Sequence, residues 1–338
     1  MKKWIVALVF IVSIGLFGCQ QQSVIEKHTD STETPAQSKP TGKTETPKQT
    51  ESTKQPVAQT KIIPSPAPVI NIIDPTTNKL IHTFTPIDLG YEMDIAAYIA
   101  QIEQFAKELA RGTDGKAGYD QRMVLDRLDE NGNLIKGNPL ILLRESILVE
   151  RIMEASVEGG TVELPIEITE SGYNPEDIQH LDDVVVASYT TYFNPTDTNR
   201  NKNIELSAEA IDKIIVGSGD HFSFNTVVGP RDEANGYQPA PEIINKKLVM
   251  GIGGGICQTS STLFNAVDQL PVKYIERHHH SIDIGYVPKG RDATVSYGGL
   301  DFRFRNATDA PFLIEAIYGK DFLTIEIKTA EKYVEFFK

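Results

Sequence analysis

Residues 253–265 read GGGICQTSSTLFN, three glycines followed almost directly by one of the two cysteines of the chain. From Ile256 to Val267 the apolar residues recur at helical spacing. Pro271 ends this pattern, because a proline ring clashes with the preceding helical turn. The stretch therefore predicts a glycine-rich loop that leads into a helix beginning near Cys257.

Two interpretations of this loop stay open from the residues alone. In a catalytic interpretation, a cysteine in the first turn of a helix meets the positive end of the helix dipole, which favours the thiolate. Gly253, Gly254 and Gly255 would let the backbone approach a ligand and offer amide groups to an oxyanion. In a structural interpretation, the glycines form a tight turn and Cys257 is buried as an inert small residue.

Three of the seven histidines follow in the run ERHHHS. A histidine here could form a thiolate–imidazolium pair with Cys257, and Asp283 or Asp292 could orient its ring. Papain-like, NlpC-type and transglutaminase-type enzymes share this chain order of cysteine, histidine and polar residue. On a strand, neighbouring side chains point to opposite faces, so we expect His279 to point away from His280.

A zinc site built from two of these histidines and Cys257 would resemble a catalytic zinc shell. No CxxC, HxxxH or HExxH spacing supports such a site. The run GIGGGI also lacks the third glycine of the dinucleotide fingerprint, and no lysine follows it as in a phosphate-binding loop. We therefore expect no metal and no other cofactor.

The first residues, MKKWIVALVFIVSIGLFGCQ, have the pattern of an export signal. Two lysines precede an apolar stretch at residues 4–17, which is shorter than the roughly 20 residues that span a bilayer. The following LFGC resembles the bacterial lipoprotein cleavage box. We expect residues 1–19 to be a signal peptide, Cys19 to be lipidated, and the protein to lie on the extracytoplasmic face of the bacterial membrane. The alternative is a plain membrane anchor with a chance cysteine.

Residues 20–62 are rich in Ser, Thr, Pro, Gln and Lys, which predicts a disordered tether because such a segment buries too little apolar surface. Subtracting its net charge of +1 and the two signal lysines from −13 leaves −16 on residues 62–338. This acidity argues against nucleic acid or an anionic bilayer surface as a partner. Membrane attachment would have to come from lipid.

The remaining chain predicts two α+β domains. Residues 63–183 combine strand-like alternation with a helix after Asp94, a hairpin at Asn131-Gly132 and a second helix near 144–156. This part resembles the peptidoglycan-binding region that precedes L,D-transpeptidase domains and occurs in related wall proteins.

The second predicted domain spans residues 184–338. It opens with a β-branched and aromatic strand, VVVASYTTYF, and continues with a helix at 204–215 in which Ile214 and Ile215 face the core. The tail alternates in TVSYG, LDFRFRN, FLIEAIYG and FLTIEIK. This alternation predicts an antiparallel sheet with hairpins at Asn306–Asp309 and Gly319-Lys320.

Long runs of the second domain resemble the VanW family. They are SYTTYFNPTDTNRNKNIELSAEAI, FSFNTVVGPRDEANGYQPAPEIINKKLVMGIGGGICQTSSTLFNA and ERHHHSIDIGYVPKGRDATVSYGGLDFRFRN. The family pattern keeps the cysteine of the glycine-rich loop, a histidine directly before serine, and the motif GxDATV. In this sequence these are Cys257, His280 and Asp292, whereas His279 stands where the family often has Pro or Asn. The resemblance implies a cell-envelope role and brings no reaction with it.

Other polar residues lie in the same runs. Thr190, Thr191, Asn225 and Arg231 are candidates to line a substrate cleft, and Arg231 could bind a substrate carboxylate in bidentate fashion. An ordinary surface salt bridge is the alternative for Arg231. The hydroxyl residues 260–262 are expected to pack, because G-x-S-x-G is absent.

Together these features favour a lipid-anchored envelope protein with a cysteine-dependent transpeptidase or peptidase domain that acts on peptidoglycan stem peptides. Cys257 would be the nucleophile, His280 the general base and Asp292 the orienting group. The alternative is a non-catalytic module that binds peptidoglycan or a protein partner and contains a structural cysteine.

Overall fold

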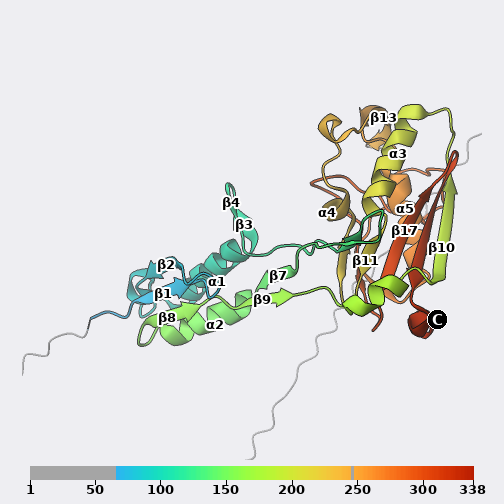
Figure 1. Cartoon of the computed structure of the whole chain (residues 1–338). Coiled ribbons are helices and arrows are strands. Elements are labelled where there is room, and N and C mark those ends of the chain that lie inside the picture. The colour runs from blue at the N-terminus through green and yellow to red at the C-terminus, as the bar shows by residue number, and fades with distance from the viewer. Residues whose placement is uncertain (1–65, 245–246) are drawn as a thin grey trace, which may run out of the picture. The chain divides into compact units, whose positions relative to one another are not determined.

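The computed structural model describes residues 66–244 and 247–338 (Figure 1). The predicted signal peptide, the lipidation site Cys19 and the tether lie outside the described residues. Within these ranges, no helix has the length and apolar character needed to cross a membrane.

The N-terminal elements pack around one hydrophobic cluster, which is built from two helices and a three-stranded sheet of order β2-β1-β8. Its largest buried side chains are Tyr98, Ile102 and Leu148. The bounds of these elements are β1 Ile70–Ile73, β2 Leu80–Phe84, α1 Ile95–Arg111, β3 Gly112–Thr113, β4 Lys116–Ala117, β7 Leu140–Leu143, α2 Glu145–Ala155, β8 Gly160–Glu163 and β9 Ile166–Thr169, with 3-10 turns η1 Pro86–Leu89 and η2 Pro175–His180.

Local signals placed both of these helices correctly. The helix predicted after Asp94 is α1, and the Asp94 side chain accepts a hydrogen bond from the Ala97 amide at 3.0 Å, as an N-cap residue should. Gly112 follows its last residue. The second predicted helix is α2.

The hairpin predicted at Asn131-Gly132 is also confirmed, as β5 Arg127–Leu128 and β6 Leu134–Ile135. This hairpin pairs with β11 Ile214–Val216, a strand of the second predicted domain. Met123 and Leu125 accordingly belong to the hydrophobic cluster of the C-terminal elements. Packing therefore crosses the predicted boundary at residues 183/184.

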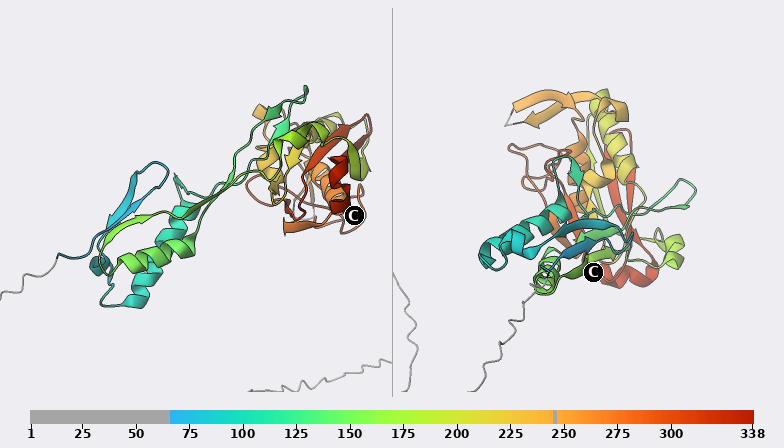
Figure 2. Two further views of the ribbon diagram at one scale, coloured as in Figure 1. Left: turned by 60° about the horizontal axis from the view of Figure 1, so that its bottom comes forward. Right: turned by 90° about the vertical axis from the view of Figure 1, so that its left-hand side faces the viewer.

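The C-terminal elements form an α+β structure with two antiparallel sheets (Figure 1 and Figure 2). The larger sheet has the order β10-β18-β17-β11-β5-β6, and α3 and α5 contact it. The smaller sheet has the order β12-β16-β15, and β13 and β14 form a separate hairpin. The bounds are β10 Val184–Tyr192, α3 Thr198–Ile211, β12 His221–Ser223, α4 Phe224–Val228, β13 Pro239–Ile244, β14 Lys247–Ile252, α5 Ile256–Val267, β15 Val272–Glu276, β16 Arg303–Asn306, β17 Phe312–Tyr318 and β18 Phe322–Thr329, with 3-10 turns η3 Glu233–Asn235 and η4 Glu331–Phe337.

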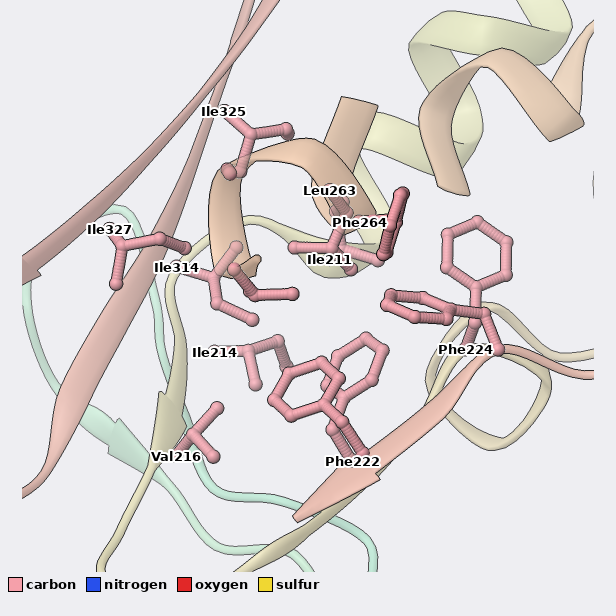
Figure 3. Packing of buried hydrophobic residues seen from close by; sticks show 14 of the residues in the cluster. Ile211, Ile214, Val216, Phe222, Phe224, Leu263, Phe264, Ile314, Ile325 and Ile327 are labelled. Atoms are coloured by element: carbon pink, nitrogen blue, oxygen red, sulfur yellow. The ribbon is translucent and has the colours of Figure 1, made fainter. Parts of the chain in front are cut away.

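The main hydrophobic cluster collects side chains from both sheets and from α3 and α5 (Figure 3). Ile211 of α3 and Leu263 of α5 meet Ile325 of the larger sheet and Phe222 of the smaller sheet. Because this one cluster joins all four elements, the position of α5 depends on both sheets at once.

The predicted end of one helix in this region was wrong. The helix predicted to reach Ile215 ends at Ile211, because Lys213 adopts a left-handed conformation with φ 59°. Ile214 and Ile215 lie instead in β11, where alternation along the strand places their side chains in different hydrophobic clusters.

The hairpin predicted at Gly319-Lys320 is confirmed and lies between β17 and β18.

The hairpin predicted at Asn306–Asp309 does not form, because β16 and β17 belong to different sheets. The buried side chain of Asn306 organises this crossing. Its amide donates to Gly217 O at 2.9 Å and to Ala310 O at 2.8 Å, and its Oδ1 accepts from the Thr308 amide at 3.0 Å. One side chain thus replaces the backbone pairs of a hairpin.

We expect Asn306→Ala to lower the free energy of unfolding by about 1–3 kcal/mol, because it leaves buried carbonyl groups without donors. Urea unfolding followed by circular dichroism measures this loss. Gln104→Ala, at an exposed amide of α1, is the control and should change stability by no more than about 0.5 kcal/mol. Equal stability of the two variants would contradict the role given to Asn306.

Candidate functional site

The loop before α5 contains three glycines because a side chain would not fit there. A Cβ atom on Gly254 would lie 2.6 Å from the carbonyl oxygens of both Ala240 and Pro241 in β13. Gly255 caps α5 with φ 111°, and a Cβ atom there would lie 2.8 Å from Cγ of Arg200. The loop therefore passes close to both β13 and α3.

Asn203 of α3 holds this loop in place and is fully buried. Its amide nitrogen donates to Gly254 O and to Gln238 O, both at 2.9 Å. Its Oδ1 accepts from the Gln238 amide at 2.7 Å. Both polar ends of the side chain are thus used to fix the entry to α5.

α5 is a polar helix inside the protein, and Cys257 is its one residue that is not fully buried. The hydroxyl groups of Ser260 and Ser261 bond to backbone, as expected for packing residues. Ser260 donates to Ala293 O at 2.5 Å, and Ser261 accepts from the Ala293 amide at 2.9 Å. Asn265 donates to Arg291 O at 2.7 Å. The run TVSYG, residues 294–298, was predicted as a strand, but the structure has no strand there. The residues before this run, Arg291 and Ala293, bond to side chains of α5 instead.

The segment that α5 holds carries Asp292, which binds two histidines. Its Oδ2 accepts from His280 Nδ1 at 2.7 Å and from the His280 amide at 2.6 Å, and its Oδ1 bonds to His279 Nδ1 at 2.8 Å. The expected alternation of His279 and His280 was wrong, because β15 ends at Glu276 and the histidines follow in irregular backbone. Asp283 has no such contact with either ring.

Hydrogen bonds keep Asp292 ionised. Burial raises the pKa of its carboxyl, but the bonds from His279 and His280 outweigh burial and the pKa is lowered. An ionised carboxylate only accepts hydrogen bonds, so His280 carries a proton on Nδ1. In the neutral ring, the lone pair then lies on Nε2.

Cys257 and His280 line the same cavity of about 790 Å³. Gly253, Gly254 and Gly255 line it as well, so the structure brings together the predicted nucleophile, base and loop. Arg200, Arg231 and Tyr286 are also part of the lining.

The Cys257 thiol is not a preformed thiolate. Burial raises its pKa, and the positive charge of Arg231 offsets only part of this rise. Across residues 66–244 and 247–338, the thiol forms one hydrogen bond, to Val295 O at 3.5 Å, and none to His280. The prediction from the helix dipole fails here because loss of solvent outweighs the first turn of α5.

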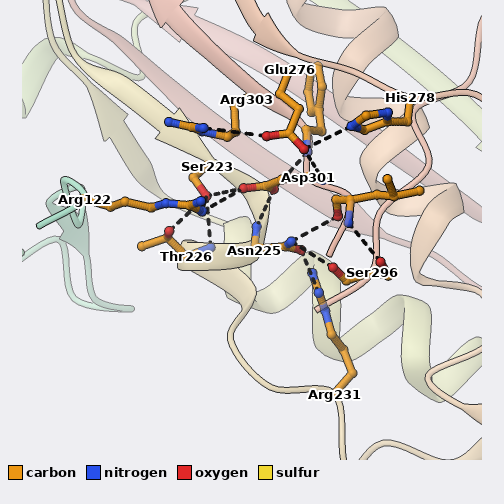
Figure 4. A network of polar contacts seen from close by, with 12 residues as sticks. Arg122, Ser223, Asn225, Thr226, Arg231, Glu276, His278, Ser296, Asp301 and Arg303 are labelled. Atoms are coloured by element: carbon orange, nitrogen blue, oxygen red, sulfur yellow. Dashed lines mark hydrogen bonds and ion pairs between the residues drawn. The ribbon is translucent and has the colours of Figure 1, made fainter. Parts of the chain in front are cut away.

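Arg231 lines the cavity as predicted, and Asn225 positions it (Figure 4). Asn225 Oδ1 accepts from Arg231 Nη1 at 2.7 Å, while its amide donates to Ser296 O and Leu300 O. Within the described ranges, Nε and Nη2 of Arg231 are buried without hydrogen-bond partners. Buried polar groups are normally paired, so this guanidinium group is suited to an incoming acceptor.

Thr190 and Thr191 are not part of the cavity lining. Thr190 bonds to Thr324 across β10 and β18 at 2.7 Å. Thr191 is buried against α5, where it bonds to Thr262 at 2.8 Å and accepts from Gln258 at 2.9 Å. Thr191 therefore holds α5 against the larger sheet, Thr190 links β10 to β18, and neither lines the cavity where substrate binding was predicted.

Arg200 is the residue that sequence reasoning missed. Its guanidinium group donates to Gln258 at 2.7 Å and lies over the Tyr286 ring at 5.9 Å. Burial lowers the pKa of both Arg200 and Arg231, so the cavity holds two poorly solvated cations. Its position within the family-like run TNRNKN was the one available signal.

Among the described side chains, no three His, Cys, Asp or Glu residues are arranged so that they could hold a metal ion. Asp197 and Glu242 also line the cavity, but neither forms an ion pair with Arg200 or Arg231 in the described part of the chain.

We expect Gly254→Ala to destabilise the protein by about 1–3 kcal/mol, because its new methyl group would press on the backbone of β13. Thermal unfolding followed by circular dichroism measures this. Gly251→Ala is the matched control, since its methyl group would meet only the flexible end of the Glu242 side chain. A Gly254→Ala protein as stable as Gly251→Ala would contradict the close approach.

We expect alkylation of Cys257 by iodoacetamide to reach half its maximal rate above the ordinary thiol value of about pH 8.5. Arg231→Leu should move this midpoint further up, because it removes the cation that opposes the rise, whereas Arg111→Leu on α1 should not. Peptide mass spectrometry of the full chain separates Cys257 from Cys19. A midpoint below pH 8 would show an activated thiolate instead.

The C-terminal part of the chain is similar to known proteins. A family model described as VanW like protein matches residues 199–328. The uncharacterized protein YoaR of Bacillus subtilis is 42% identical over 193 residues, which make up 56% of this chain and 63% of that protein. The vancomycin B-type resistance protein VanW of Enterococcus faecalis is 33% identical over 121 residues, or 34% of this chain and 44% of that protein.

The chain thus covers less than two thirds of the length of either relative. No solved structure is significantly similar to it. The matched region contains the glycine loop, Cys257, His280 and Asp292. Residues 199–328 of the chain are therefore similar to the VanW family.

Proposed function

We propose that the protein is a cell-envelope cysteine acyltransferase that acts on the stem peptides of peptidoglycan. One observation carries the proposal: Cys257 and His280 line one cavity, and Asp292 orients His280 so that Nε2 is the free nitrogen. A nucleophile, a base and an orienting carboxylate are the parts that acyl transfer through a thioester requires.

In the first step, Cys257 Sγ attacks the carbonyl carbon of a peptide bond and forms a carbon–sulfur bond. The thiol proton passes to His280 Nε2. The carbon–nitrogen bond then breaks, and His280 returns this proton to the leaving nitrogen. The raised pKa of the thiol fits this order, because the base removes the proton during the reaction and no thiolate is needed beforehand.

The loop before α5 supplies the electrostatic part of the reaction. Negative charge develops on the carbonyl oxygen when sulfur attacks, and backbone amides at a helix start are suited to stabilise it. Gly254 and Gly255 line the cavity beside Cys257, and Asn203 holds Gly254 through its carbonyl oxygen. Such a rigid loop needs little reorganisation in the transition state.

The two arginines define the acyl donor. Arg200 and Arg231 line the cavity, and Arg231 has buried nitrogen atoms without partners within the described chain. A carboxylate on the donor peptide would satisfy them through charge-assisted hydrogen bonds. Stem peptides, which contain free carboxylates, meet this requirement.

The cell envelope is the proposed location. The expected export signal and lipidation of Cys19 would anchor the protein outside the membrane, and residues 63–183 would bind peptidoglycan. A relative named as a vancomycin B-type resistance protein supports an envelope role.

A non-catalytic binding module is the second candidate. The bond from Cys257 to Val295 O favours it, because this contact stabilises the protonated thiol at rest. The glycine loop and the arginines would then recognise a peptide without forming a thioester.

To separate the two candidates, the full chain is incubated with purified stem peptides and examined by intact-protein mass spectrometry. We expect a thioester adduct that is lost in Cys257→Ala. We also expect His280→Gln to slow adduct formation by about 10²–10⁴-fold, as loss of a general base does. The matched control is His278→Gln, because His278 bonds to Glu276 at 3.0 Å and not to Asp292.

The control variant should acylate within about twofold of the wild type. Absence of any adduct on the wild-type protein, together with retained binding of the peptides, would establish the binding module. Adduct formation at the wild-type rate in His280→Gln would remove the base from the mechanism.

A further inference from the structure

A second cavity, of about 530 Å³, adjoins the one that contains Cys257. Its lining comes from residues 279–292, and it shares His280 and Ile284 with the Cys257 cavity. The proposed base therefore borders two separate spaces. A hydrolase needs room for one peptide and a water molecule, whereas a transferase needs room for two substrates.

The two cavities differ in charge. Arg200 and Arg231 give the Cys257 cavity two half-buried cations. The second cavity has the carboxylate of Asp283, which forms no ion pair with any described residue, and one lysine, Lys289. The Asp292 carboxylate also belongs to its lining.

Apolar side chains complete the second cavity, namely Ile282, Ile284, Val287 and Pro288. An aliphatic chain that ends in an ammonium group fits such a lining, because its methylene groups contact the apolar residues and its charge meets a carboxylate. Lys289 can pair with a carboxylate elsewhere on the same ligand.

We infer that the second cavity is the acceptor site of the proposed acyltransferase: it binds an amino acid or peptide with an aliphatic primary amine, and Asp283 holds the ammonium group. This inference rests on the proposed function, and it makes the protein a transferase between two peptides. His280 lies where the acceptor amine would pass to reach the thioester.

The second step is aminolysis of the thioester. The bound ammonium group loses one proton to solvent, and the neutral nitrogen attacks the thioester carbonyl carbon. A carbon–nitrogen bond forms and the carbon–sulfur bond breaks. The second amine proton passes through His280 Nε2 to the Cys257 sulfur, which restores the thiol.

Binding tests the acceptor site without any turnover. The probe is Nα-acetyl-lysine, which has an aliphatic amine and a carboxylate, and the protein is the full chain with Cys257→Ala. We expect Asp283→Asn to weaken binding about tenfold, as loss of a hydrogen-bonded charge does. Asp309→Asn, at an exposed aspartate outside the cavity, is the matched control and should bind like its parent.

Turnover gives a second readout in the wild-type background. With a stem peptide as donor and Nα-acetyl-lysine as acceptor, mass spectrometry measures the ratio of aminolysis to hydrolysis. Asp283→Asn should lower this ratio about five- to tenfold and leave the rate of thioester formation within twofold. A ratio that does not respond to Asp283→Asn would overturn the acceptor site.

The two proposals fail in different ways. A wild-type protein that forms no thioester refutes the acyltransferase. Probe binding that is absent, or that is equal in Asp283→Asn and Asp309→Asn, refutes the acceptor site whether or not a thioester forms.

Discussion

Burial of a polar helix is the constraint on which the rest of this structure depends. α5 places serine, threonine, glutamine and asparagine side chains inside the protein, and each would cost about 1–3 kcal/mol if left without a partner. Their partners are β10, α3 and the backbone of residues 291–293. Because α5 fixes these residues, it also fixes Asp292, and Asp292 in turn fixes the ring of His280.

The glycine loop at residues 253–255 serves both the packing of the fold and the proposed chemistry. Its small residues are required by the close approach to β13 and α3, whatever the protein does. The same approach places Cys257 at the cavity and leaves no side chain between the loop backbone and a ligand. The structural and catalytic interpretations of GGG therefore differ only in what the thiol does, since both require the same backbone.

Features set by neighbouring residues were predictable, and features set by distant ones were not. The cap at Asp94, the turn at Asn131-Gly132 and the start of α5 follow from local chemistry. The failed hairpin at Asn306–Asp309 depends on carbonyls of residues 216–217, some 90 positions away. The alternation in TVSYG likewise predicted a strand, whereas the backbone of residues 291–293 just before it bonds to side chains of α5.

The same distinction between local and distant determinants applies to the candidate site. Residue type and motif predicted Cys257, His280 and Arg231, which line one cavity, and Asp292, which bonds to His280. They could not distinguish Thr191, a buried partner of α5, from a residue that lines a cavity, because both lie in family-like runs. Sequence also gave no measure of desolvation, and burial of the thiol decides the direction of its pKa.

The strand order of the larger sheet limits how this domain can be transferred between proteins. The region of family likeness begins at residue 199, but β10 and the β5–β6 hairpin, which precede it, cover the two sides of the β18-β17-β11 ribbon. A fragment that begins at residue 199 would leave the backbone of β18 unpaired on one side of the sheet and that of β11 unpaired on the other. Unpaired edge strands tend to pair with other chains and aggregate. Any polypeptide that inherits this module must therefore bring its own edge strands with it.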